Sequence, residues 1–298
     1  ATLTSRTARL ATRLTMSLLF GMTGVLLVPA GAHPVALVTS FDPDILALEA
    51  IAFDPAAGTL FLYHDASGEI REFTIAGVEV LPLIPAAVGA GNDTDLDFTS
   101  VALSIAGTIV PAGSLITFNG DAYKIQALNK DTGALLAETP EPLSLQGGFV
   151  MPVTGALFGL DWGSELIAEL AASDGHVVRS FPIAPPGSPP FGIYFGDIEY
   201  CPADRVILVG GTSSSAIRFL ALSGSWIGDL DLAGLGIAVD EIGGLALNDV
   251  TGHLWIAGRS GIVYELSGVC DSFAIFLDGF ETNDTSRWSV TSPLLPEP

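Results

Sequence analysis

The stretch LEAIAFDPAAGTLFLYHDASGEIREFTIAG, residues Leu48–Gly77, contains three apolar segments separated by the turn sequences DPAAG and DASG. Apolar and aromatic segments of this length, bounded by Asp, Ser and Gly, are typical of β-strands joined by tight turns. One such meander cannot cover both of its own faces. We therefore expect further sheets of the same kind elsewhere in the chain.

The last strand of this stretch returns four times. The copies are IREF from Ile70, IQAL from Ile125, IAEL from Ile167, IRFL from Ile217 and VYEL from Val263. A turn glycine follows each copy, and successive glycines lie 42 to 56 residues apart: Gly77, Gly133, Gly175, Gly224 and Gly268. Repeats of about 40 to 50 residues with four strands each are typical of propeller blades. The sequence predicts an all-β, five-bladed β-propeller over residues 33–268.

The predicted inner strands recur at intervals of 47 to 50 residues. They begin near Ile51, Val101, Val150, Ile198 and Leu245. The segment HPVALVTSF, His33–Phe41, has no hairpin partner beside it, so we predict that it closes the ring as the outer strand of the last blade. Closure by the segment Ser272–Leu277 is the alternative that the sequence leaves open.

The first 32 residues have the pattern of a secretory signal peptide. Three arginines precede the apolar run Leu14–Val28, and small residues end it at Ala32. The run is shorter than the roughly 20 residues that span a bilayer, so a retained membrane anchor is the less favoured alternative. We expect cleavage after Ala32, no membrane span in the mature chain, and a secreted, periplasmic or cell-surface location in a Gram-negative bacterium.

The strong negative charge of the chain restricts the molecules that it can bind. The net charge is −22, and removing Arg6, Arg9 and Arg13 with residues 1–32 makes it −25. Such a field repels phosphate backbones and anionic lipid, so no nucleic-acid partner is expected. With 49% hydrophobic residues the chain is too apolar for a disordered protein. We expect a monomer that binds a protein or small-molecule ligand not identifiable from the sequence.

Two cysteines, Cys201 and Cys270, are present. In an exported chain such a pair is more often a disulfide than a pair of reactive thiols. We predict this bond, which would fasten the C-terminal tail, residues 269–298, to the propeller. Two unpaired buried thiols are the alternative.

Acidic residues gather where the connections between blades are expected to converge on the axis. The predicted loop Leu81–Phe98 ends in NDTDLD, and carboxylates two residues apart can surround a calcium ion. The predicted metal ligands are Glu49, Asp93, Asp95, Asp97, Asp197 and Glu241. Arg259, at a matching turn, could balance one of these acids or bind an anionic ligand. A set of solvated, turn-capping carboxylates is the alternative.

Other chemistry has little support in the sequence. Neither a G-x-S-x-G elbow nor an H-E-x-x-H pair occurs, so catalytic residues stay unassigned. We expect Trp162, Trp226 and Trp255 to pack in the core, with stacking on sugars as the less favoured alternative. The proline-rich segment Ala184–Phe191 is predicted to be a rigid connector, with a role as a rim or lid as the alternative.

The blade sequences DPAAGTLFLYHDASGEIREF and NDVTGHLWIAGRSGIVYEL resemble those of secreted bacterial propellers of the NHL, SdiA-regulated and esterase-like phytase kind. Propeller lactonases are also similar in general appearance, and that likeness implies carboxylates around a calcium ion at the channel mouth. The tail segment IFLDGFETNDTSRWS, from Ile275, resembles one that ends many exported Gram-negative proteins and implies sorting or surface attachment. An amphipathic strap packed on the propeller through Phe276, Phe280 and Trp288 is the alternative.

Three functions follow as hypotheses. The first is an exported binding or surface module with calcium at the channel mouth. The second is a calcium-dependent hydrolase of the lactonase or phytase-like esterase type, which would use Glu49, Asp97 and Asp197 as metal ligands. The third is an extracellular scaffold with no small ligand.

Overall fold

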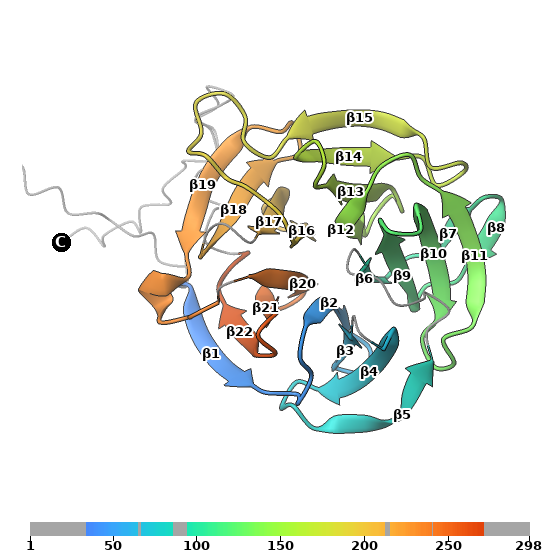
Figure 1. The fold of residues 1–298 in the computed structure, drawn as a ribbon, viewed down its shortest axis with the longest axis horizontal. Helices are drawn as coiled ribbons and strands as arrows, with labels where there is room; N and C mark the ends of the chain where they lie inside the picture. Colours follow the sequence, from blue (N-terminus) through green and yellow to red (C-terminus); the bar gives the residue numbers. More distant parts are fainter. Residues whose placement is uncertain (1–33, 65–66, 86–93, 212–214, 240, 271–298) are drawn as a thin grey trace, which may run out of the picture. The chain divides into compact units, whose positions relative to one another are not determined.

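Five four-stranded antiparallel sheets are arranged around a central axis (Figure 1). This computed structural model describes residues 34–64, 67–85, 94–211, 215–239 and 241–270. Within these ranges 22 strands and one short 3-10 helix, Ala233–Leu235, make up the regular structure. The predicted all-β, five-bladed propeller is therefore confirmed. The predicted signal peptide and the tail segment from Ile275 lie outside the described residues.

The blades follow the chain order, each running from the axis outward. Blade 1 holds β2 (Leu48–Asp54), β3 (Thr59–His64), β4 (Glu69–Thr74) and β5 (Glu79–Pro85). Blade 2 holds β6 (Thr94–Thr99), β9 (Ser114–Asn119), β10 (Lys124–Asn129) and β11 (Leu135–Pro140). Blade 3 holds β12 (Leu145–Val150), β13 (Leu157–Asp161), β14 (Leu166–Leu170) and β15 (Val177–Pro182). Blade 4 holds β16 (Gly196–Cys201), β17 (Val206–Gly211), β18 (Ala216–Ala221) and β19 (Trp226–Asp231).

The last blade joins the two ends of the described chain. It contains β20 (Ile242–Asn248), β21 (His253–Gly258) and β22 (Val263–Ser267), and its outer strand is β1 (Ala36–Phe41) (Figure 1). β1 runs antiparallel to β22, with Ala36 opposite Ser267 and Phe41 opposite Val263. Closure by the N-terminal strand is confirmed.

The repeated turn glycines pack neighbouring blades together. All five have a positive φ, between 67° and 85°. A Cβ atom on Gly77 would lie 2.7 Å from the ring of Phe41, and one on Gly224 would lie 2.7 Å from Phe181. Each of these turns therefore rests on the outer strand of the preceding blade, where a side chain would clash. At these two positions the glycine that marks the repeat is thus also required by the packing.

Hydrophobic clusters fill the spaces between neighbouring sheets. The second strands β3, β9, β13, β17 and β21 are buried along almost their whole length. In the cluster between blades 3 and 4, Phe149 stacks on Phe158 of the same blade with ring centroids 4.8 Å apart. No helix in the described ranges is long and apolar enough to cross a membrane.

Blade 2 departs from the prediction. Its inner strand is β6, Thr94–Thr99, and not a strand near Val101. A small hairpin, β7 (Leu103–Ile105) and β8 (Thr108–Val110), is inserted between β6 and β9. The prediction took the acids of TDLDFT for loop residues. They are strand residues, because Asp95 and Asp97 alternate with Leu96 and Phe98.

Candidate functional site: carboxyl groups along the channel

Two inner strands each carry a pair of acids at alternate positions. β6 carries Asp95 and Asp97, and β16 carries Asp197 and Glu199. Residues two apart on a strand share one side of it. The register of the sheets places small or apolar residues at the corresponding positions of the other inner strands: Ala50, Ala52, Gly147, Phe149, Gly244 and Ala246.

The pair on β6 binds the inner edge of the next blade, which has no neighbouring strand. Oδ2 of Asp95 accepts a hydrogen bond from the backbone N–H of Gly148 at 2.8 Å, and Oδ2 of Asp97 accepts one from Val150 at 2.5 Å. Both donors belong to β12, the innermost strand of blade 3. An inner strand has no further strand on its axial side, so its N–H groups need other acceptors.

The pair on β16 does the same for blade 5. Oδ2 of Asp197 accepts from the backbone N–H of Leu245 at 2.6 Å, and the carboxyl group of Glu199 accepts from the N–H of Leu247. Blades 2 and 4 thus cap the inner edges of blades 3 and 5 with the same alternating acids. We interpret these four acids first as structural groups that complete the sheet edges.

Asp95 and Asp197 also contact each other across the channel. Both are buried, with relative exposures of 0% and 1%. Burial, followed by the charge of Asp197, raises the pKa of Asp95 well above its usual range. Burial likewise raises the pKa of Asp197 to about 8. Oδ1 of Asp95 has no hydrogen-bond donor among the described residues, so a proton shared by the two carboxyl groups best satisfies both.

A glycine makes this close approach feasible. A Cβ atom on Gly147, in β12, would lie 2.5 Å from Cα of Asp197 and 2.7 Å from its Oδ1. Any side chain at this position would displace the acid of the neighbouring blade. The narrow packing around the axis therefore depends on the small residues that lie opposite the acids.

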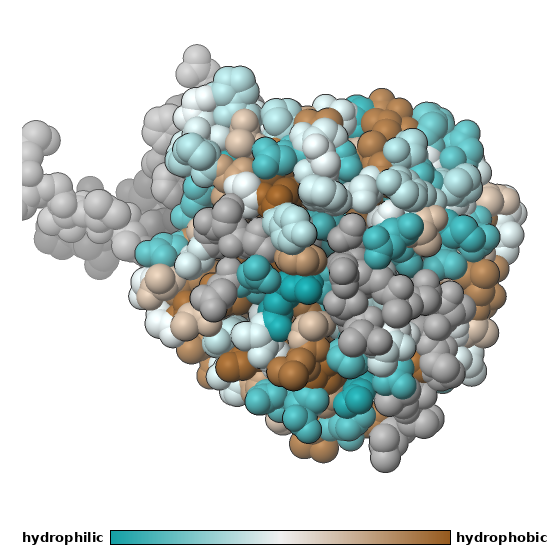
Figure 2. All heavy atoms as spheres, in the orientation of Figure 1, coloured by the Kyte–Doolittle hydropathy of each residue, from teal (hydrophilic) through white to brown (hydrophobic). Residues whose placement is uncertain are grey.

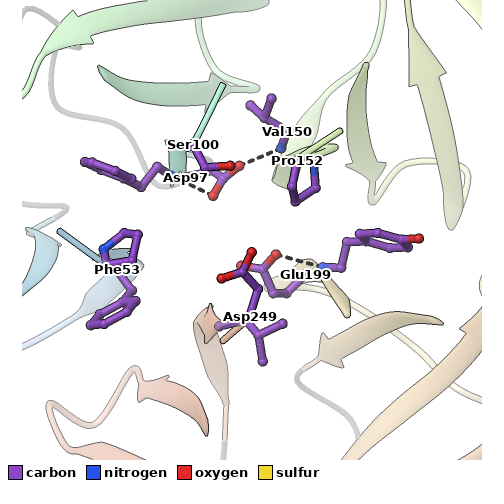
Figure 3. A pocket seen from close by; sticks show the side chains of 11 residues that line it. Phe53, Asp97, Ser100, Val150, Pro152, Glu199 and Asp249 are labelled. Carbon is purple, nitrogen blue, oxygen red and sulfur yellow. Dashed lines mark hydrogen bonds between the residues drawn. The ribbon is translucent and has the colours of Figure 1, made fainter. Parts of the chain in front are cut away.

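Asp97 and Glu199 lie closer to one end of the channel and line a pocket there. Figure 3 shows the carboxyl groups of Asp97, Glu199 and Asp249 directed at one opening. The volume of the pocket is about 40 Å³, room for a few waters or a small cation. The residues that line it are Phe53, Pro55, Asp97, Phe98, Ser100, Val150, Pro152, Glu199, Tyr200, Leu247 and Asp249. None of these described residues is basic.

Burial changes the acidity of two of these groups. It raises the pKa of Asp97 to about 6, against the opposing effect of the backbone N–H groups of Val150 and Phe98. Burial and then the nearby charge of Asp97 raise the pKa of Glu199 well above its usual range. Both groups therefore hold a proton to a higher pH than an exposed carboxyl group does.

This pocket opens on the face that was not expected to be functional. Pro55, Ser100, Pro152 and Asp249 belong to the turns between first and second strands, and we call this end the turn face. We call the opposite end, which carries the connections between blades, the connector face. Asp95, Asp97 and Asp197 were expected at the connector face, as residues of loops that precede the inner strands, whereas all three lie within these strands.

At the connector face the acids are paired with a cation. Nη1 of Arg259 contacts Oε2 of Glu49, and its Nε lies 3.4 Å from Oε2 of Glu241. The guanidinium group also lies 3.6 Å from the ring centroid of Phe195. Figure 2 shows hydrophilic residues gathered over the inner end of blade 5, where β20 and β21 lie. The expectation that Arg259 balances one of the acids is confirmed.

The predicted metal-ligand set is therefore divided. The structure brings together Asp95, Asp97 and Asp197, whereas Glu49 and Glu241 meet at Arg259, and Asp93 lies outside the described residues. Sequence reasoning missed Glu199 and Asp249. The Asp-Ile-Glu of β16, which repeats the Asp-Leu-Asp of β6, was the available signal for Glu199. Among the described residues, no three His, Cys, Asp or Glu side chains come together in a way that could hold a metal ion.

The two cysteines are buried neighbours with free thiols in this structure. Sγ of Cys201 lies 3.8 Å from the carbonyl oxygen of Cys270. The hydrogen bond with Cys201, together with burial, raises the pKa of the Cys270 thiol. The predicted disulfide is not formed here and stays a prediction.

Comparisons with known proteins agree on the architecture. No family model and no curated protein matches the sequence. The crystal structure of *Myxococcus xanthus* glutaminyl cyclase is similar, with 13% identity and a TM-score of 0.57 over 78% of this chain and 95% of that one. The WD40 propeller domain of Doa1 has 12% identity and a TM-score of 0.45, covering 74% of this chain and 78% of that one.

A protein of unknown function from *Bacteroides caccae* has 15% identity and a TM-score of 0.45, with coverages of 71% and 70%. At these identities the likeness concerns the fold alone. The chain shares its fold with the glutaminyl cyclase structure, and the finer resemblance to NHL and phytase-like propellers stays a prediction.

Proposed function

We propose that the protein is an exported binding module that holds a cation in the turn-face pocket of its channel. The observation that carries the proposal is the lining of this pocket: three carboxyl groups and, among its described residues, no basic side chain. A strongly acidic chain adds a long-range field that attracts cations to such an opening.

The pocket does not form a compact calcium cage. Calcium takes six to eight oxygen ligands, whereas Asp97, Glu199 and Asp249 line this described pocket without coming close enough together to hold a metal ion. Both carboxylate oxygens of Asp97 already accept backbone N–H groups, from Phe98 at 2.6 Å and from Val150 at 2.5 Å. The pocket is better suited to a hydrated ion or an organic ammonium group.

The aromatic residues of the pocket favour the organic cation. Phe53, Phe98 and Tyr200 line the same opening as the three acids. Ammonium groups are bound by aromatic rings as well as by carboxylates. Calcium and a quaternary ammonium ion are therefore the two probes that show whether the pocket binds a metal ion or an organic cation.

Calorimetric titration of residues 33–298 with calcium chloride and with tetramethylammonium chloride tests the proposal. We expect binding of one of these cations, weakened about tenfold by Asp249→Asn, the loss of one favourable charge interaction. Asp44→Asn is the matched control, since Asp44 is exposed, lies outside the pocket and has a φ of 57°, which asparagine tolerates. The absence of heat and of any change in Tm with both salts would leave the scaffold without a ligand as the better account.

The hydrolase alternative has one supporting observation. A pKa of about 6 for Asp97 is suitable for a general acid or base near neutral pH. Its predicted ligand set is not assembled, because Glu49 is held by Arg259. A lactone and phosphoester screen decides the question: turnover that Asp97→Asn abolishes would favour the enzyme over the binding module.

A further inference from the structure

A groove lies on the outside of the propeller between blades 3 and 4, away from the channel. Its volume is about 480 Å³. It is lined by the end of β15, by the proline-rich connector that follows, and by the turn between β18 and β19. The lining residues are Phe181, Pro182, Pro185, Pro186, Gly187, Ser188, Ser223, Gly224, Ser225 and Trp226.

The groove is uncharged. None of these described lining residues is Asp, Glu, Lys or Arg, although the chain has a net charge of −22. Ligand sites of this size typically have apolar and aromatic walls with a few polar groups. A lining without charges selects a neutral ligand.

Arg218 fixes one wall. This fully buried residue of β18 makes two hydrogen bonds to Asp229, at 2.8 Å and 2.9 Å. It also donates to the carbonyl group of Ile183, just before the connector, at 3.2 Å, and to that of Pro189, within the connector, at 3.0 Å. Its guanidinium group lies over the ring of Phe191 at 4.5 Å. The connector is thus pinned to blade 4, which supports the rigid connector of the sequence analysis.

Trp226 forms the opposite wall. It was expected in the core, but it begins the outer strand β19, and 39% of it is exposed. Its indole N–H donates to Oδ1 of Asp229 at 3.1 Å, the same carboxylate that Arg218 holds. The ring is therefore held in one orientation before any ligand arrives, which lowers the entropic cost of binding.

Two serine hydroxyl groups line the same groove as the indole ring. Oγ of Ser223 and Oγ of Ser225 lie 3.1 Å apart on the turn, and both residues are exposed. A flat apolar ring with adjacent hydroxyl groups offers one surface to the C–H face of a sugar and another to its hydroxyl groups.

We propose that this groove binds a neutral saccharide, with a sugar ring on Trp226 and its hydroxyl groups at Ser223 and Ser225. A proline-rich peptide is the less suitable occupant. Such peptides dock in grooves lined by several aromatic residues, whereas Trp226 is the exposed aromatic residue among those described in this groove, and prolines of the chain itself already occupy one wall.

The test is calorimetric titration of residues 33–298 with cellotriose, chitotriose, mannotriose and an octaproline peptide. We expect one trisaccharide to bind with a Kd of about 0.1 to 1 mM. Trp226→Ala should weaken this binding at least about tenfold, while Trp226→Phe should keep part of it. The control is Trp162→Ala, which removes another exposed tryptophan that does not line the groove. Circular dichroism and Tm of each variant show whether it is folded.

Three outcomes would overturn the proposal: no binding of any trisaccharide at about 10 mM, equal losses in Trp226→Ala and Trp162→Ala, or binding of the peptide alone. Because the ligand is neutral, its affinity should not change with salt. Asp249→Asn, which alters the channel pocket, should also leave saccharide binding unchanged. Failure of the groove and failure of the cation site are thus separate results.

Discussion

The acids at the connector face and those inside the channel are neutralised by different means. At the connector face, Glu49 and Glu241 contact the guanidinium group of Arg259. Deeper along the axis, Asp95 and Asp197 face each other and accept backbone N–H groups. The first set is balanced by a cation, and we expect the second to share a proton, because burial raises the pKa of both carboxyl groups. Acidic residues near one axis therefore need not form one ligand set, and among the three acids of the turn-face pocket Asp249 is the exposed one.

The largest effect on stability is expected from removing the guanidinium group of Arg259. Arg259→Met should lower the free energy of unfolding by about 3 to 5 kcal/mol, because Glu49 is 4% exposed and would be left without its partner. Urea denaturation measures the loss. Lys124→Met is the control, since its ion pair with Glu138 is exposed and such pairs contribute less than about 1 kcal/mol. Combining Arg259→Met with Glu49→Gln should restore part of the loss, and equal losses in Arg259→Met and Lys124→Met would contradict the comparison.

A smaller effect is expected from removing one acid inside the channel. Asp197→Ala should cost about 2 to 3 kcal/mol, because the N–H groups of Leu245 and Ile198 lose their acceptor. Asp197→Asn keeps an acceptor oxygen and should cost less. Denaturation curves that rank the two variants in the opposite order would show that the carboxyl group does not act as an edge cap.

The free energy of unfolding should depend on pH through the buried acids of the channel. Burial raises the folded-state pKa of Asp97 to about 6 and that of Asp197 to about 8, both above their unfolded values. Their contribution to stability is therefore fully present below about pH 4 and is lost as pH rises toward 8. The free energy of unfolding should fall by up to about 1.4 kcal/mol per pH unit for each group.

The control for this profile is Asp197→Asn, which cannot lose a proton at this position. Its stability should decline less between pH 5 and 8, as measured by urea denaturation at several pH values. A wild-type profile that rises over this range would contradict the account of shared protons.

The smallest effect on stability is expected at the mouth of the pocket. Asp249 is exposed on a turn, so Asp249→Asn should change the free energy of unfolding by less than about 0.5 kcal/mol. The same variant should lose cation affinity. A large loss of stability would mean that Asp249 belongs with the structural acids.

Local turn chemistry made much of the fold predictable. Glycines such as Gly77 and Gly224 marked the repeat, because their positive φ and close packing leave little choice of residue. The isolated strand before Phe41 predicted ring closure, because a strand with no hairpin neighbour must pair elsewhere.

The site was less predictable, because its acids are defined by a neighbouring blade. Asp95 and Asp97 are strand residues, and their carboxylate oxygens accept hydrogen bonds from the backbone N–H groups of Gly148 and Val150, about 50 residues away in sequence. No local pattern shows that pairing. The prediction of a core position for Trp226 was wrong for a related reason. Its surroundings include the connector that follows blade 3, which is distant in sequence.

The protonation of Asp95 and Asp197 tests the central claim most directly. Carbon-13 NMR of the side-chain carboxyl groups, followed from pH 4 to 9, reports the charge of the pair. The account predicts that at pH 6 the pair still holds a proton and that it titrates with an apparent pKa well above that of an ordinary carboxyl group. Two fully ionised carboxylates at pH 6 would contradict it.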